Sequence, residues 1–228
     1  MGTILIIFAY LCYAIFLWRI VWRIVLLLKL SGHTEHGALQ PRKASLLEIL
    51  KTGRDIIFFT RLLRSNPLLW IGEWVFHMSF ILVLVRHLRY VLDTAPHWLM
   101  NLQFAGMLAG YVLPVALVYV VAIKLWVEKT RYFSSGNFFL LSLLFLLSVT
   151  GLIMKNFIHP DIISIKNFIS NALAFRFATA PESYLFVVHF IAAFVFLAYL
   201  PTHIFAAPFT LLEARKREEE HGGIMHER

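Results

Sequence analysis

The sequence predicts an all-α integral membrane protein with five transmembrane helices. Hydrophobic residues make up 60% of the 228 residues, 21 residues are phenylalanine, and the mean hydropathy is +0.74. A bilayer core needs about 20 consecutive apolar residues for each helix. Five runs reach that length, at about 3–28, 68–92, 99–127, 137–158 and 183–209. We therefore expect a single membrane domain over residues 1–228, and a soluble domain of ordinary composition is excluded.

The first run is expected to remain in the mature protein as a helix. It has no basic segment before it, and it ends in WRIVWR without the small residues of a cleavage site. Both features argue against a cleaved signal peptide.

Three polar or amphipathic segments lie outside the apolar runs. The segment 41–66 mixes apolar residues with regularly placed cations and is expected to lie in the inner membrane interface, either as a plain lipid-surface helix or as a docking face. The segment 161–178 is a second amphipathic piece, expected at the outer interface. The tail 213–228 is a mixed charge run, which is typical of a solvated end.

Basic residues predict the orientation. All but five of the 21 lysines and arginines fall on one side of the membrane if the N-terminus is outside. Cytoplasmic loops of membrane proteins carry an excess of cations, so we expect the N-terminus outside and the C-terminus in the cytoplasm. The expected location is the cell inner (cytoplasmic) membrane. The net charge of +8 is explained by this topology, and a nucleic-acid partner is not expected.

Four of the ten histidines lie inside apolar runs. His77 and His87 lie in the second run, within HMSFILVLVRH, and His189 and His203 lie in the fifth, within VVHFIAAFVFLAYLPTH. Ionisable groups at membrane depth are costly and usually face a partner in the bundle interior. Since helices 2 and 5 run antiparallel, His77 shares the inner half with His203, and His87 shares the outer half with His189.

Two histidines on facing helices can supply both axial ligands of a haem iron. With Cys12 as the single cysteine, neither a C-x-x-C-H attachment site nor a thiolate-bound cluster is possible. The sequence therefore predicts two non-covalent b-type haems (protohaem) between helices 2 and 5, although a lone membrane histidine often only bonds a carbonyl. Arg86 and Arg89 are candidates for the propionates of the outer haem or for snorkelling to the interface. Gly106 and Gly110 either allow close helix packing or make room for a macrocycle.

At these histidines the chain resembles the gamma subunits of respiratory nitrate reductases, the five-helix dihaem cytochromes b that recur in sulfate-reducer membrane complexes with heterodisulfide-reductase-like partners. In that family the two ligands on helix 2 also stand ten residues apart and map onto His77 and His87, and the helix 5 ligands map onto His189 and His203. The fourteen-residue spacing on helix 5 is shorter than in the nitrate-reductase members. The resemblance implies a subunit of a membrane oxidoreductase that exchanges electrons between a quinone, such as menaquinone, near the outer haem and a cytoplasmic-side iron–sulfur subunit, in either direction.

Two other functions compete with electron transfer. A transporter or proton channel would use the histidines as a relay, but no chain of acidic residues accompanies them. A plain membrane anchor would leave the paired histidines unexplained. The quinone site is expected on the outer side, where polar anchors are available. These candidates are Arg89, Asp93, His97, Tyr111, Glu182 and Tyr184.

A partner is expected to dock on the inner face. Basic residues there can steer an acidic partner surface. They occur from Arg42 to Arg64, at Lys129 and Arg131, and from Arg215 to Arg217.

Overall fold

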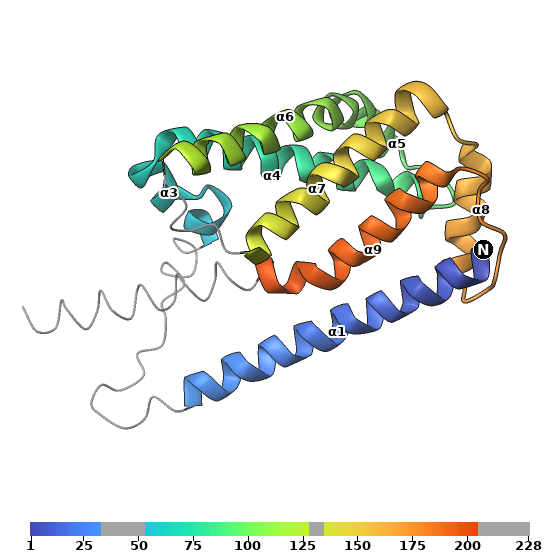
Figure 1. The fold of residues 1–228 in the computed structure, drawn as a ribbon, viewed down its shortest axis with the longest axis horizontal. Helices are drawn as coiled ribbons and strands as arrows, with labels where there is room; N and C mark the ends of the chain where they lie inside the picture. Colours follow the sequence, from blue (N-terminus) through green and yellow to red (C-terminus); the bar gives the residue numbers. More distant parts are fainter. Residues whose placement is uncertain (33–52, 128–134, 205–228) are drawn as a thin grey trace, which may run out of the picture.

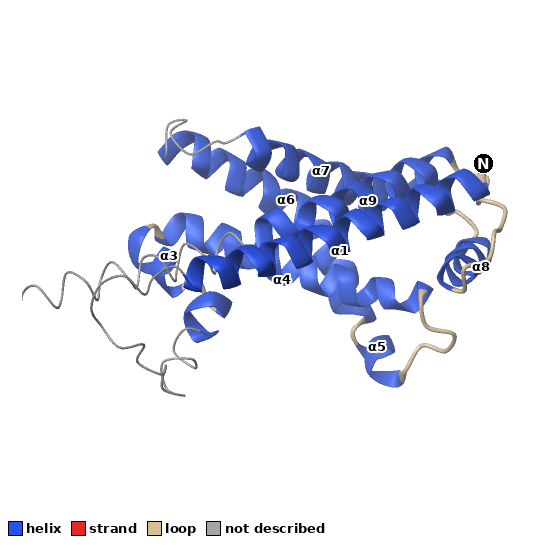
Figure 2. Cartoon of the chain, turned by 90° about the horizontal axis from the view of Figure 1, so that it is seen from below, coloured by secondary structure: helices blue, strands red, loops and turns tan. Residues whose placement is uncertain are grey.

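Five long helices form the framework of the chain (Figure 1). The computed structural model describes residues 1–32, 53–127 and 135–204. Its long helices are α1 (Gly2–Gly32), α4 (Pro67–His87), α6 (Gln103–Val127), α7 (Ser135–Ile153) and α9 (Tyr184–Ile204). Each is long and apolar enough to cross a membrane, so the chain is an all-helical, multi-pass membrane protein with five candidate spans. The described part of the chain contains helices and loops and no strand, as Figure 2 shows.

The helices pack in a definite order. Helix α4 packs mainly on α6, α6 on α7, α7 on α9, and α9 on α1. The pair α4 and α9 is not among these closely packed pairs, although the two helices together carry all four intramembrane histidines. In Figure 1, α9 is inclined to α4, and α1 lies at the side of the bundle away from α6.

Apolar side chains form two buried clusters at opposite ends of the bundle. One joins α1, α8 (Ile162–Leu173) and α9 around Ile6, Phe168 and Phe190. The other joins α4, α6 and α7 around Phe76 and Leu117. We call the end with α8 the outer end and the opposite end the inner end, as names for the two ends of the bundle.

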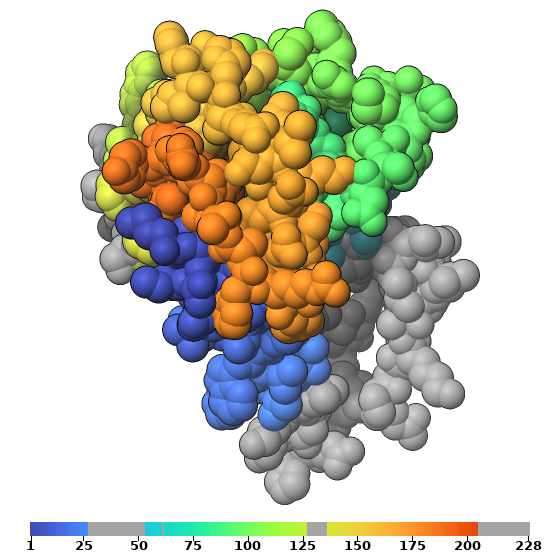
Figure 3. Space-filling view, turned by 90° about the vertical axis from the view of Figure 1, so that its right-hand side faces the viewer, coloured from blue at the N-terminus to red at the C-terminus, as the bar shows by residue number. Residues whose placement is uncertain are grey.

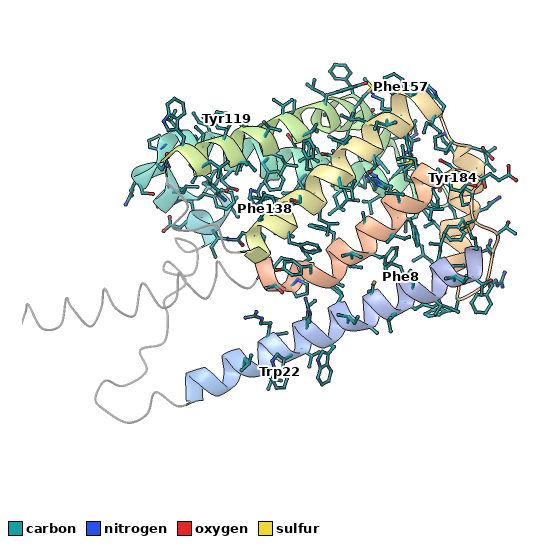
Figure 4. The ribbon with its side chains drawn as sticks, viewed as in Figure 1. Phe8, Trp22, Tyr119, Phe138, Phe157 and Tyr184 are labelled. Atoms are coloured by element: carbon teal, nitrogen blue, oxygen red, sulfur yellow. The ribbon has the colours of Figure 1, made fainter. Side chains whose placement is uncertain are left out.

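The surface of the long helices is apolar. Ile4, Trp18, Phe104 and Val115 are each more than 60% exposed, and Figure 4 shows Trp22 and Phe157 pointing away from the bundle. Such a belt of exposed apolar side chains is expected where lipid tails, not water, surround the helices.

Short helices interrupt the two ends of the bundle. The second apolar run ends as a 3-10 turn, η1 (Leu88–Tyr90), and the third begins with a separate helix, α5 (His97–Asn101), because the helix breaks at Leu102. The fourth run ends in a π-helical turn, η2 (Met154–Ile158), followed by His159 with φ 49°. The fifth run is described as far as Ile204.

The expected inner interfacial segment is described from residue 53. Residues 53–57 are helical, and α3 (Thr60–Ser65) follows a break at Phe59, which has φ 49°. Asn66 then ends this segment and starts α4, because its side chain accepts a hydrogen bond from the Leu69 amide and Pro67 occupies the first turn. Lys129, Arg131, the stretch from Arg42 to Lys51 and the tail with Arg215 to Arg217 lie outside the described residues.

The outer amphipathic segment forms α8 across the end of the bundle. The Asp161 carboxylate caps it by accepting hydrogen bonds from the Ile163 and Ser164 amides. Tyr10 of α1 donates a hydrogen bond to the Ala172 carbonyl, so α1 is tied to α8. Figure 3 looks onto this end and shows the α8 region between the start of α1 and the green residues around α5.

Candidate functional site

The four intramembrane histidines meet as two pairs across α4 and α9. The ring centroids of His77 and His203 are 6.4 Å apart with an angle of 16° between the ring planes. Those of His87 and His189 are 6.3 Å apart at 10°. These are the pairs that antiparallel helices require, and we call them the inner pair and the outer pair. They lie ten residues apart on α4 and fourteen on α9, or roughly 15 and 21 Å of helical rise, which the inclination of α9 accommodates.

Hydrogen bonds fix the tautomer of both histidines on α4. Nδ1 of His77 donates to the Glu73 carbonyl over 2.6 Å, and Nδ1 of His87 donates to the Val83 carbonyl over 2.7 Å. A carbonyl oxygen can only accept, so Nδ1 carries the proton in each ring. The lone pair of each ring is then on Nε2, which is the nitrogen left for a metal.

His189 has a hydroxyl partner on another helix. Thr150 of α7 lies 2.8 Å from Nδ1 of His189, and its hydroxyl also donates to the Leu146 carbonyl. Because a hydroxyl has one proton to donate, it accepts the proton of His189 Nδ1. Nε2 is again the free nitrogen.

The spacing of the rings suits one metal atom between each pair. A metal–imidazole bond is about 2.0 Å long and the ring nitrogen lies about 1.1 Å from its ring centroid, so two rings on opposite sides of one metal would have centroids about 6.2 Å apart. Within the described residues, no group of three or more histidine, cysteine or acidic side chains could hold a metal ion alone. A pair of imidazoles therefore fits an iron that already has a macrocycle and needs two axial ligands.

The packing around the two pairs is uneven. These helices are not closely packed on each other, and His87 and His203 are exposed although they face the partner helix. A Cβ added at Gly110 of α6 would meet nothing within 4 Å, whereas one at Gly106 would lie 3.1 Å from the Arg86 side chain. Gly106 thus allows close packing of α6 against Arg86 of α4, whereas Gly110 has open space beside it.

An aromatic contact lies between the two levels. Phe80 of α4 and Phe196 of α9 meet edge to face with centroids 5.7 Å apart. Phe80 is three residues after His77, and Phe196 is midway between His189 and His203. The two pairs are therefore separate sites.

The inner pair has an ion pair and an aromatic ring beside it. Lys124 of α6 contacts Glu73 over 2.6 Å, and the other Glu73 oxygen lies 3.7 Å from Nδ1 of His77. The ring of Phe59, from the break before α3, lies 4.9 Å from that of His77. An acidic side chain, a cation and a ring from the segment before α3 thus gather at His77.

The outer pair has cations and no such acid. Arg86 lies against Gly106, and the Arg89 guanidinium lies 4.8 Å from the Tyr90 ring centroid. Tyr90 lies 5.9 Å from His87, again between ring centroids. Arg86 and Arg89 are near His87 in the chain, and the structure assigns neither of them a carboxylate partner among the described residues.

The candidate quinone anchors are divided between separate places. Glu182 and Tyr184 line an open, largely apolar hollow of about 440 Å³ together with Ser183, Ile158 and Val188. The other four, which include Arg89 beside Tyr90, do not line this hollow. Tyr111 donates to Asn156 of η2 and accepts from Lys155, the Asp93 carbonyl accepts from Lys166, and His97 begins α5.

The structure adds three side chains that sequence reasoning did not assign to the site. They are Thr150, Lys124 and Phe59. The hydroxyl of Thr150 lies inside an apolar run, and this position in the sequence could have indicated a polar partner in the bundle. Glu73 lies one helical turn before His77, which signals contact between them, but nothing in the sequence identifies Lys124 as the partner of Glu73.

Comparisons with known proteins find two cytochrome b-like relatives. The chain is 30% identical over 176 residues to an Hdr-like menaquinol oxidoreductase cytochrome b-like subunit of Archaeoglobus fulgidus, which is 64% of this chain and 53% of that protein. It is 25% identical over 150 residues to the protein of the same description from Archaeoglobus profundus, which is 58% of this chain and 44% of that protein. The chain spans about half the length of these curated relatives and is their distant homologue. No protein-family model and no solved structure matches it.

Proposed function

We propose that the chain is a dihaem b-type cytochrome subunit that exchanges electrons between menaquinol and a partner oxidoreductase subunit. The two histidine pairs carry this proposal, because both have the ring spacing of two axial ligands on one iron. The distant homology to cytochrome b-like subunits of menaquinol oxidoreductases supports it independently.

His77 and His203 would hold one haem, and His87 and His189 the other, through Nε2. Bound there, haem supplies a one-electron carrier at each level of the membrane. The chain itself fixes the ligands by the Nδ1 hydrogen bonds to Glu73, Val83 and Thr150. Arg86 and Arg89 are proposed to neutralise the propionates of the outer haem, since arginine binds carboxylates well.

The proposed orientation has the N-terminus and the outer pair outside and the inner pair on the cytoplasmic side. Among the described residues, seven lysines and arginines lie toward the inner end and five toward the outer end. The inner set is Arg19, Arg23, Lys29, Arg54, Arg61, Arg64 and Lys124, and the outer set is Arg86, Arg89, Lys155, Lys166 and Arg176. The positive-inside rule favours this placement in the cytoplasmic membrane.

The hollow beside Tyr184 is the proposed quinol site. Its size suits a ring with a short length of apolar tail, since ligand pockets measure about 300–1,000 Å³. Its wall includes Leu185, one helical turn before His189 on α9. The Glu182 carboxylate would accept a proton from the quinol hydroxyl, and the Ser183 and Tyr184 hydroxyls would orient the ring.

The proposed partner is an iron–sulfur or heterodisulfide-reductase-like subunit on the inner face. The Hdr-like description of the relatives supports this class. The side chain of Arg54 is 60% exposed and Arg64 is exposed, in the short segment whose Phe59 contacts His77. A docked acidic surface would therefore lie close to the inner pair.

The test begins with the visible spectrum of the chain purified in detergent from its native membrane. We expect two acid-acetone-extractable protohaems per chain, both low-spin, and both reduced by menadiol, a soluble menaquinol analogue. A preparation without a Soret band would contradict the proposal, and a proton flux through reconstituted vesicles without haem would favour a histidine relay. Glu182→Gln should slow reduction by menadiol but leave reduction by dithionite unchanged, whereas Thr179→Ala nearby should change neither.

A further inference from the structure

Among the described residues, the inner pair has a carboxylate neighbour that the outer pair lacks. One oxygen of Glu73 binds Lys124, and the other lies 3.7 Å from the protonated nitrogen of His77. The carboxylate thus has the ammonium on one oxygen and the imidazole near the other.

Both members of this ion pair lie within membrane spans. Glu73 belongs to the span 67–90 and Lys124 to the span 103–126, and their side chains are only 16% and 27% exposed. An unpaired charge inside the membrane costs free energy, and pairing with the opposite charge offsets much of that cost. Because electrostatic interactions are stronger away from bulk water, the carboxylate acts on His77 more than a surface charge would.

A carboxylate behind a ligating histidine changes the metal. The Nδ1 proton of His77 is donated to the Glu73 carbonyl, so the carboxylate, 3.7 Å from that nitrogen, acts through its negative charge and would stabilise the more positive, oxidised metal. Lys124 limits this effect because it withdraws negative charge from the same carboxylate. At the outer pair, the rings bond the Val83 carbonyl and the Thr150 hydroxyl, and the charged side chains next to His87 in the chain, Arg86 and Arg89, are positive.

We propose that the Glu73–Lys124 ion pair positions His77 and sets the midpoint potential of the inner haem, with Glu73 lowering that potential and Lys124 raising it. This rests on the proposed haem site at His77 and His203. Glu73 and Lys124 are positioning residues, since they act on the metal through His77.

The test is a spectroelectrochemical titration of the purified protein, in which the two haems are followed as separate components. Glu73→Gln keeps the size of the side chain and removes its charge, so the potential of the inner haem should rise. Lys124→Met leaves the carboxylate unneutralised, so the same potential should fall. We expect about a tenfold change in the ratio of oxidised to reduced inner haem at fixed ambient potential, which is 59 mV for one electron.

Two controls separate this effect from general disturbance. Lys124→Arg keeps the charge and should change the potential of the inner haem by only a small fraction of that shift. The double variant Glu73→Gln with Lys124→Met should return toward the wild type, and the outer haem should stay unchanged in every variant.

Opposite signs in the two single variants support the proposal, because a purely structural pair would shift both in the same direction. Shifts of equal sign, no shift, or equal shifts at both haems would overturn it while leaving the dihaem function intact. If Glu73→Gln fails to accumulate, the contrast between Lys124→Met and Lys124→Arg decides alone. A wild-type protein without haem would overturn the proposed function and this inference together.

Discussion

The inner and outer histidine pairs share their geometry and differ in their surroundings. Their centroid distances are 6.4 and 6.3 Å, and in both pairs the α4 histidine donates to the carbonyl four residues earlier in its own helix. Around the inner pair lie Glu73 and Lys124, whereas the outer pair meets the Thr150 hydroxyl. The α4 backbone thus orients the α4 ring in both places, whereas the side chains beside the rings differ: Glu73 of α4 with Lys124 of α6 at the inner pair, and Thr150 of α7 at the outer pair.

The largest expected effect comes from breaking one pair at a time. His77→Ala and His203→Ala should each remove the same spectral component, and His87→Ala and His189→Ala should each remove the other, because an iron that loses one axial ligand is no longer low-spin. Absorption and paramagnetic resonance spectra of the four variants measure this. Loss of the same component in His77→Ala and His189→Ala would show that the pairs are wrongly assigned.

A smaller effect is expected from the hydroxyl that serves only the outer pair. Thr150→Val removes the acceptor of His189 Nδ1, and loss of such a partner typically costs about 10–100-fold in metal affinity. The outer haem should therefore transfer faster to an apoglobin acceptor, and the inner haem should not. Thr150→Ser should behave as the wild type. Ser148→Ala is the matched control, because Ser148 bonds only the Phe145 carbonyl of its own helix.

Close packing beside the outer pair can be tested with two glycines of α6. A Cβ at Gly106 would meet Arg86 Cβ and Cδ at 3.1 Å, and a Cβ at Gly110 would meet nothing within 4 Å. Overpacking costs about 1–3 kcal/mol, so Gly106→Ala should lower the thermal midpoint relative to Gly110→Ala. Both variants have the same gain in helix propensity, so their difference isolates the contact. Equal midpoints would mean that Arg86 moves aside without cost.

The smallest effect is expected at the surface of the inner end. Arg54→Glu with Arg64→Glu should release copurifying partner subunits at a several-fold lower NaCl concentration, because exposed charges are screened over about 10 Å at 0.1 M salt. Affinity pull-down of the tagged chain at increasing salt measures this. Arg176→Glu, at the outer end, should have no effect. If Arg176→Glu releases the partner at the same NaCl concentration as the double variant, docking occurs on the outer face.

The spans and the meeting of the histidines were predictable from the sequence. Apolar run length locates the spans, and alternation of direction across the membrane brings His77 to His203 and His87 to His189. The break at Leu102 and the π-turn at Met154 were not predictable, because both residues lie in apolar runs that read as continuous helices. The contact between Thr150 and His189 joins residues 39 positions apart. It depends on the rotation of α7 about its own axis, which hydropathy does not specify because every face of this helix is apolar.

The packing of α1 on α9 has a consequence for how the protein is made. Arg19 donates to the Ala198 carbonyl across 179 positions of sequence, and Ile6 is fully buried in the cluster that includes Phe190. At about 5–20 residues per second, the ribosome needs roughly 10–40 s to travel that distance. During this time the first helix lacks the contacts that it makes with α9 in the folded protein. Docking of the first span on α9 therefore has to follow insertion of the last candidate span.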